Sequence, residues 1–186
     1  MRMVRGAIWG LVCVLIAVPA AAGERAPRGL IYDVKVGVQV HDVPYMWSGF
    51  NKEPYSADLN VEVMFSPAIM LLGGAIRPAI GATINFDGYT SKAYIDARWQ
   101  WECSWHTFIG VGIGIAVHDG IDESFVVEPD RKLLGRRVLF HPNAEVGYRL
   151  DEHNSLSLYF EHISNASTAA KNQGLDTLGV RYGYRF

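Results

Sequence analysis

The chain has 186 residues, 49% of them hydrophobic and 12% aromatic, and its 17 basic and 19 acidic residues leave a net charge of −2. This length suits one domain. The nearly balanced charge, with no basic stripe, argues against a nucleic-acid partner.

The first 22 residues have the organisation of a secretory signal peptide. Arg2 and Arg5 give a positive start, residues 7–18 form an apolar run, and residues 20–22 are alanines before Gly23. The run is too short for a membrane-spanning helix and ends in a cleavage pattern. We therefore expect residues 1–22 to be removed and residues 23–186 to form the mature domain; a retained N-terminal anchor is the alternative. Cys13 would leave with the leader, so Cys103 would have no intrachain disulfide partner.

The mature chain alternates between apolar and polar residues with a period of two, which is the pattern of β-strands. The pattern appears in eight segments, covering residues 32–41, 59–66, 76–86, 92–102, 105–118, 137–149, 155–164 and 177–186. We expect one strand in each segment. Pro78 and Pro142 fall inside two of them and lack a donor for the ladder, which predicts either a bulge or a later strand start there.

The composition of the two faces favours a transmembrane β-barrel over a periplasmic β-sandwich, which is the alternative. The polar faces mix both signs of charge with glycine, as the interior of a narrow barrel requires. On this interior face we expect Glu161 to pair with Arg181 of the next strand. Segments of about ten residues can cross a bilayer when tilted, and closing eight strands removes every sheet edge. The sequence thus predicts an all-β, eight-stranded antiparallel barrel in the bacterial outer membrane.

The seventh segment carries polar residues on its apolar face. His162 and Ser164 have the parity of Leu156, Leu158 and Phe160, so all five project to one side. With the N-terminus in the periplasm, this strand runs outward and the eighth runs back from about residue 175. Asp176 then lies at the outer start of the eighth strand, on the lipid-facing side. Hairpin pairing should bring Asp176, His162 and Ser164 together on one patch at the height of the outer leaflet.

These three residue types are those of a serine esterase. A histidine can take the serine proton, and an aspartate can fix the imidazole tautomer and stabilise the imidazolium. Asn165 and the turn after it could offer amide donors to a tetrahedral oxyanion. The alternative is that His162 and Ser164 merely anchor the barrel in the headgroup layer.

The stretch His162-Ile163-Ser164-Asn165-Ala166 resembles the His-x-Ser-Asn-Ala signature of the outer-membrane lipid A 3-O-deacylase family of the PagL type, an acyloxyacyl hydrolase-like group. The acid follows fourteen residues after the histidine, as in that family. The likeness covers the mature chain in strand count and is sharp from about Tyr159 to Phe186.

The resemblance implies hydrolysis of the ester-linked 3-hydroxyacyl chain at position 3 of lipid A, with His162 as base, Ser164 as nucleophile and Asp176 as orienting acid. Asn165 and Ser167 would lie at the oxyanion hole or position the substrate. No metal or cofactor is implied, and the partner is lipid A or lipopolysaccharide in the outer membrane. The chain departs from the family in having aspartate where glutamate is usual, and Ser167 where glycine can occur.

Two rival functions remain open from the sequence. An outer-membrane phospholipase A-like enzyme also shows a His-x-Ser-Asn pattern, but uses a larger barrel, an asparagine as third member and calcium. A non-catalytic structural barrel of eight strands is the second rival. The sequence leaves the oligomeric state open, with a homodimer among the options.

Overall fold

The computed structural model describes residues 29–103, 105–122 and 128–186. The predicted signal peptide, residues 1–22, lies outside the described residues and stays a prediction. Within the described part of the chain, no helix is long and apolar enough to cross a membrane.

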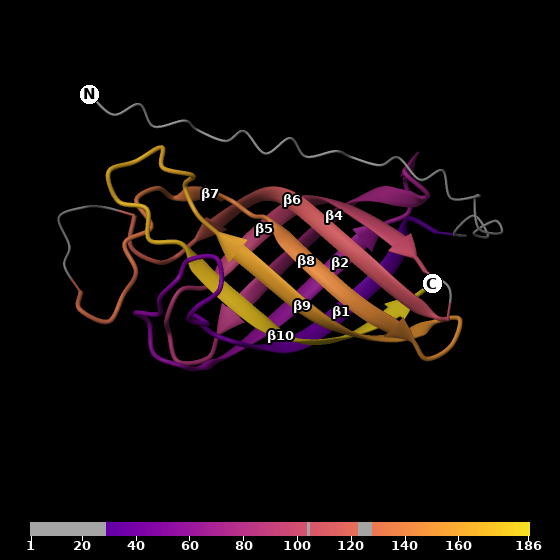
Figure 1. The fold of residues 1–186 in the computed structure, drawn as a ribbon, viewed down its shortest axis with the longest axis horizontal. Helices are drawn as coiled ribbons and strands as arrows, with labels where there is room; N and C mark the ends of the chain where they lie inside the picture. Colours follow the sequence, from indigo (N-terminus) through magenta and orange to yellow (C-terminus); the bar gives the residue numbers. More distant parts are fainter. Residues whose placement is uncertain (1–28, 104, 123–127) are drawn as a thin grey trace, which may run out of the picture.

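The described residues form one antiparallel sheet that curves into a barrel (Figure 1). Its elements are β1 (Ile31–Val40), β2 (Ala57–Phe65), β3 (Ile69–Leu71), β4 (Gly74–Asn85), β5 (Lys92–Glu102), β6 (Thr107–His118), β7 (Val138–Phe140), β8 (Asn143–Arg149), β9 (Asn154–Ile163) and β10 (Leu175–Arg185). Consecutive strands pair along the chain, except that β2 pairs with β4 beyond β3, and β6 pairs with both β7 and β8. The sheet closes because β1 also pairs with β10.

The ten elements make eight transmembrane strands of the barrel, as predicted; each of these eight strands is called a stave below. β3 is a short arm paired only with the start of β4. β7 and β8 are two parts of one stave, because both pair with β6 in the same register, Ile115 opposite Phe140 and Gly112 opposite Asn143. Pro142 interrupts this stave without shifting it. No bulge forms here, but β8 begins only at Asn143, directly after the proline, which is the later start that was expected; residues 141–142 separate it from β7.

At Pro78 the expectation of a bulge or late start is wrong. β4 begins at Gly74 and runs through Pro78, which pairs with Ala97 of β5. On the other side, pairing with β2 ends at Met64 opposite Ala79. The missing N–H of the proline therefore falls just beyond the ladder with β2, where no donor is needed.

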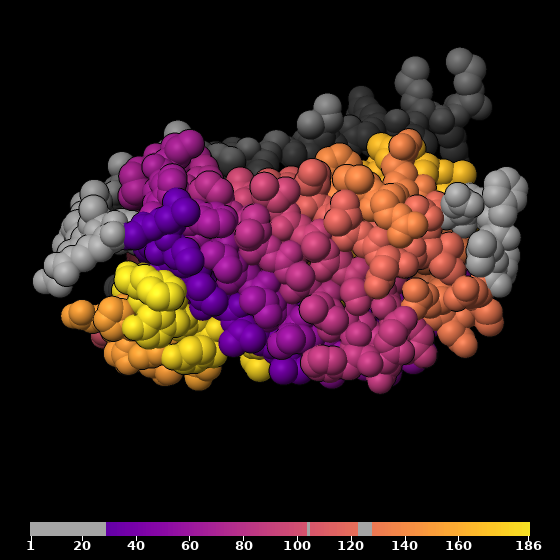
Figure 2. All heavy atoms as spheres, turned by 180° about the vertical axis from the view of Figure 1, so that it is seen from behind, coloured from indigo at the N-terminus to yellow at the C-terminus, as the bar shows by residue number. Residues whose placement is uncertain are grey.

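The barrel is inverted relative to a soluble protein, with polar side chains inside and apolar ones outside. In β1, Asp33, Lys35 and Gln39 are buried, whereas Val36 and Val38 are exposed. Side chains from neighbouring strands form a continuous wall on the face shown in Figure 2. This arrangement suits a wall surrounded by hydrocarbon, because apolar side chains meet lipid and all backbone groups pair between strands.

Buried ion pairs fill the interior. The carboxylate of Glu145 accepts hydrogen bonds from Lys35 at 2.7 Å and Arg98 at 2.6 Å, and it forms an ion pair with Arg181 at 2.8 Å. The expected partner of Glu161 was wrong: Glu161 pairs with Lys92 at 2.8 Å and with His141 at 3.1 Å. Arg181 and Glu161 lie on the inner face of adjacent strands. The long side chain of Arg181 instead extends across the lumen to Glu62 and Glu145.

The two ends of the barrel differ. At one end lie the start of β1, the C-terminus and the short turns. The loop residues 41–56, 119–122, 128–137 and 164–174 gather at the other end (Figure 1). The residues singled out by the sequence lie at this long-loop end.

Candidate active site

The register of the last hairpin brings the predicted base and acid together. Asp176 of β10 pairs directly with His162 of β9. In an antiparallel pair, side chains directly opposite each other are about 5 Å apart at Cβ. The imidazole Nδ1 of His162 lies 2.5 Å from Asp176 Oδ1. The carboxylate thus accepts the Nδ1 proton, which leaves Nε2 as the nitrogen able to take a proton.

The imidazole is held on two further sides. The ring of Trp47, from the β1–β2 loop, stacks on it with 4.8 Å between centroids and 11° between planes. Gly174, just before β10, packs against the ring edge: a Cβ added there would lie 2.5 Å from His162 Cε1. Among the described residues, Nε2 has no hydrogen-bond partner.

The carboxylate of Asp176 is also fixed from the β1–β2 loop. Its Oδ2 accepts from the backbone N–H of Ser48 at 2.7 Å and from the Ser48 hydroxyl at 2.8 Å. The backbone carbonyl of Asp176 accepts from the N–H of Val43 at 2.9 Å. Three hydrogen bonds therefore join this loop to one residue of β10.

This loop changes the predicted environment of the site. His162 and Asp176 have the expected outward parity, but they are only 3% and 0% exposed and do not face lipid directly. An unpaired carboxylate on a lipid-facing wall would be costly. The loop removes that cost by covering the pair and donating two hydrogen bonds to it.

Ser164 lies just beyond the end of β9 and is half-buried. Its backbone pairs with Phe140 of β7, which continues the sheet by one residue. Its side chain makes no hydrogen bond to His162 or to another described residue. The structure thus brings Asp176 and His162 into contact, and it places Ser164 two residues after His162, just beyond the end of β9, without a hydrogen bond to the pair.

Asn165 and Ser167 lie in the turn after Ser164. The side-chain amide of Asn165 donates to the carbonyls of Leu134 at 2.8 Å and Lys171 at 2.5 Å, and its backbone N–H donates to the side chain of Asn172. Asn165 therefore ties the turn to its surroundings. Ser167 has a φ of 62°, and its backbone N–H donates to no described group.

Lys132 and Glu53 hold the loops over the site. Lys132 is fully buried, and its ammonium contacts Asp42 at 2.6 Å, the carbonyls of Phe50 and Gly174 at 2.7 Å and the Ser48 hydroxyl at 3.3 Å. Loop 119–137, the β1–β2 loop and the start of β10 therefore meet at one buried charge.

Glu53 joins three loops through its carboxylate. It accepts from His41 at 2.8 Å, from the Thr90 N–H at 3.0 Å and from the Lys132 N–H at 3.0 Å. Burial alone would raise the pKa of Glu53, but the hydrogen bonds from His41, Thr90 and Lys132 outweigh it and lower the pKa to about 2.

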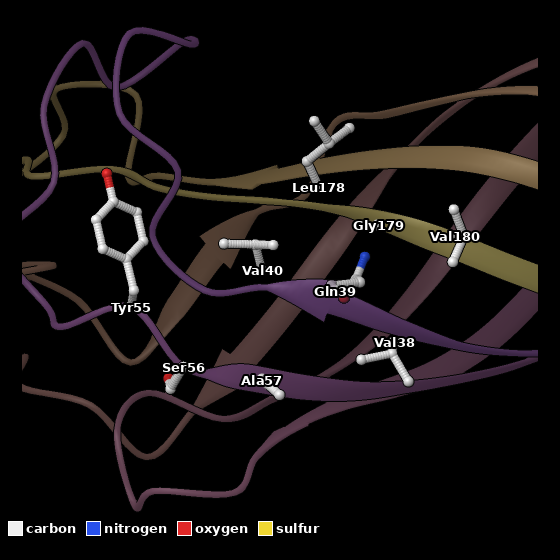
Figure 3. Close-up of a pocket in the computed structure, with 9 residues that line it drawn as sticks. All are labelled: Val38, Gln39, Val40, Tyr55, Ser56, Ala57, Leu178, Gly179 and Val180. Atoms are coloured by element: carbon white, nitrogen blue, oxygen red, sulfur yellow. The ribbon is translucent and has the colours of Figure 1, made fainter.

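An apolar groove of about 580 Å³ lies on the outer wall next to the site. It is formed by β1, β2 and β10 and the end of the β1–β2 loop, and it is lined mainly by Val38, Val40, Tyr55, Ala57, Leu178 and Val180 (Figure 3). Leu178 lies two residues below Asp176 on the same face of β10. Apolar surface is thus available beside the polar pair.

The residues that sequence reasoning missed are Trp47, Ser48 and Lys132. They lie in loops far from His162 in the chain, where no periodicity assigns a direction to a side chain. The one available signal was the aromatic content of the first long loop, where Tyr45, Trp47, Phe50 and Tyr55 occur within eleven residues.

Comparison with known proteins agrees with the family suggested by the motif. The family model described as lipid A 3-O-deacylase (PagL) matches residues 45–185. The lipid A deacylase PagL of Bordetella bronchiseptica is 24% identical over 186 residues, covering 96% of this chain and 95% of that protein.

Solved structures share the fold. The crystal structure of the outer membrane enzyme PagL superposes with a TM-score of 0.63 at 16% identity, covering 83% of this chain and 99% of that one. Neisserial surface protein A (NspA) superposes with a TM-score of 0.51 at 7% identity, covering 84% of this chain and 97% of that one. At these identities both likenesses show the fold alone. Because the family model spans most of the chain, from the β1–β2 loop to the end of β10, this outer-membrane β-barrel belongs to the lipid A 3-O-deacylase (PagL) family.

Proposed function

We propose that this chain removes the ester-linked 3-hydroxyacyl chain from position 3 of lipid A through Ser164, His162 and Asp176. The observation that supports this assignment best is the pairing of His162 Nδ1 with Asp176 at 2.5 Å while Nε2 has no partner among the described residues. An imidazole held in this tautomer is a general base poised for a neighbouring hydroxyl.

In the proposed reaction, the Ser164 Oγ attacks the ester carbonyl carbon and its proton passes to His162 Nε2. The tetrahedral intermediate collapses, the bond to the sugar 3-oxygen breaks, and that oxygen takes the proton from His162. Water then attacks the acyl-serine ester with the same imidazole as base, which releases a 3-hydroxy fatty acid and restores Ser164.

The oxyanion donor is assigned to the backbone N–H of Ser167. That group donates to no described residue, and it follows the nucleophile within the same turn. Asn165 is assigned to substrate positioning through the turn, because its amide already donates to the carbonyls of Leu134 and Lys171. The acyl chain needs no deep pocket, since apolar wall such as the groove beside Leu178 lies next to the site.

Replacement of the nucleophile tests the proposal. Ser164→Ala should lower the release of 3-hydroxy fatty acid from lipid A by more than about a thousand-fold, as followed by mass spectrometry of lipid A and of the released acid. Ser66→Ala serves as the matched control, because Ser66 lies at the opposite end of the barrel, where its hydroxyl donates to the Gly29 carbonyl. Both variants should keep the heat-modifiable gel mobility of a folded barrel.

Full activity of folded Ser164→Ala would contradict the assignment of the nucleophile. Parallel assays with phospholipid, with and without a chelator, address the phospholipase A-like alternative. Calcium-dependent release from phospholipid, with no release from lipid A, would favour that alternative.

A further inference from the structure

We propose that Ser48 is a positioning residue for this reaction: it fixes the carboxylate of Asp176 so that the other carboxylate oxygen can orient His162. The inference rests on the proposed function and adds a fourth side chain to the site. Ser48 lies 128 residues before Asp176 in the chain, on a different loop.

The two oxygens of the Asp176 carboxylate have different partners. Oδ1 faces His162 Nδ1 at 2.5 Å, and Oδ2 faces Ser48, with the backbone N–H at 2.7 Å and the hydroxyl at 2.8 Å. A carboxylate that accepts on one oxygen only can rotate about its Cβ–Cγ bond. Two donors on Oδ2 remove that rotation, and they hold the carboxylate in the plane that the imidazole needs.

The Ser48 hydroxyl is itself directed by its surroundings. Lys132 Nζ lies 3.3 Å from Ser48 Oγ and donates to it, so the hydroxyl proton is free to be donated. Of its two acceptors, Asp176 Oδ2 at 2.8 Å is nearer than the Phe50 carbonyl at 3.4 Å. Lys132 has no exposed surface and is anchored by Asp42 at 2.6 Å. Donated hydrogen bonds thus run from a buried ammonium through Ser48 to Asp176, whose other oxygen accepts from His162.

Trp47, the residue before Ser48 in the β1–β2 loop, contacts His162, the other member of the pair. Its indole stacks on the His162 ring, yet the residue is 66% exposed. An exposed aromatic side chain this large would otherwise gain little from ordering in one position. Adjacent residues of one loop therefore hold the imidazole by its face and the carboxylate by its outer oxygen.

The test uses the full-length protein in detergent micelles with lipid A as substrate. Ser48→Ala removes the hydroxyl and keeps the backbone donor, so kcat should fall on the order of ten-fold with KM unchanged, because Ser48 contacts Asp176 and not the substrate. Ser48→Thr keeps a hydroxyl and should restore kcat to within about two-fold of the parent. Ser66→Ala should leave both constants unchanged.

A double-variant cycle separates positioning from a general structural effect. In the Asp176→Ala background, measured over long incubations, Ser48→Ala should cause no further loss, since the group it positions is gone. The inference is overturned if Ser48→Ala retains the parent kcat, if it changes only KM, if Ser48→Thr is as impaired as Ser48→Ala, or if Ser48→Ala lowers the Asp176→Ala activity by its full factor.

Ser164→Ala and Asp176→Ala, assayed in the same experiment, distinguish failure of the Ser48 positioning role from failure of the proposed function. If both strongly lower release and Ser48→Ala does not affect it, the positioning role fails and the proposed function stands. If Ser164→Ala is fully active, the proposed function fails first.

Discussion

At the scale of single residues, the site depends on a glycine that contacts the imidazole. Gly174→Ala would place a methyl group 2.5 Å from His162 Cε1, so the imidazole ring must shift from its position. Displacement of a catalytic group by about 1 Å can cost about a hundred-fold in rate. We expect Gly174→Ala to lower kcat by that order.

Gly29→Ala is the matched control for this substitution, because a Cβ there would meet no atom within 4 Å. Release of 3-hydroxy fatty acid from lipid A is the measurement for both variants. An unchanged rate for folded Gly174→Ala would show that the position of the imidazole edge does not limit the reaction.

The length of the acid side chain leads to a second prediction. Asp176 already reaches both His162 and Ser48, so its arm fits the distance between strand and loop. Asp176→Glu adds a methylene inside this arrangement, and we expect kcat to fall about ten-fold through misplacement of the pair. The measurement is the rate of lipid A deacylation against the parent; a strong rise in activity would instead indicate that aspartate is a defect at this position.

At the scale of elements, the ionised carboxylate of Glu53 is one of the groups that hold the β1–β2 loop over the site. The ordinary pKa of glutamate is 4.5, and in the folded protein the pKa of Glu53 is about 2. A depressed pKa contributes stability that is fully present above the unfolded value and is lost as the pH falls through the folded value. We therefore expect the hydrogen bonds of Glu53 to His41, Thr90 and Lys132 to weaken as the pH falls from 4.5 to about 2, which would loosen the β1–β2 loop.

Limited proteolysis with pepsin can follow this loosening, since the loop contains Phe50. Cleavage in residues 41–56 should rise as the pH falls through that window. Glu53→Gln should make the loop susceptible across the whole window, because the charge that accepts from His41 and Lys132 is absent. Equal cleavage of parent and variant at every pH would contradict this role of Glu53.

At the scale of the whole molecule, stability depends on charges inside the barrel. Glu145 lies between three cations, Lys35, Arg98 and Arg181. Glu145→Gln would leave those cations without their shared carboxylate, and breaking a buried pair typically costs about 3–5 kcal/mol. Urea unfolding in phospholipid vesicles should show that the free energy of unfolding falls by this amount.

Glu102→Gln is the control for a charge at the rim. Glu102 pairs with Arg149 at 2.7 Å, but its side chain is 33% exposed, so its loss should cost at most about 1 kcal/mol. Equal destabilisation by the two variants would mean that the central network does not dominate the stability of the barrel.

Much of this architecture could be predicted from the sequence, because period-two alternation determines which side chains face inward and hairpin connections determine which strands are neighbours. Those two facts were enough for the eight staves and for the contact between His162 and Asp176. The partner of Glu161 was predicted wrongly, because long side chains in a narrow lumen choose among several strands.

What the sequence by itself determined is therefore the closed barrel and the face on which His162, Ser164 and Asp176 lie. The tertiary structure alone decided that this face is covered, that Ser48 and Trp47 hold the acid and the imidazole, and that Lys132 and Glu53 gather the loops. The physical reason is that strand periodicity is a local property of the chain. The direction of a loop side chain depends on contacts with residues far away in the sequence, and these exist only once the barrel has closed.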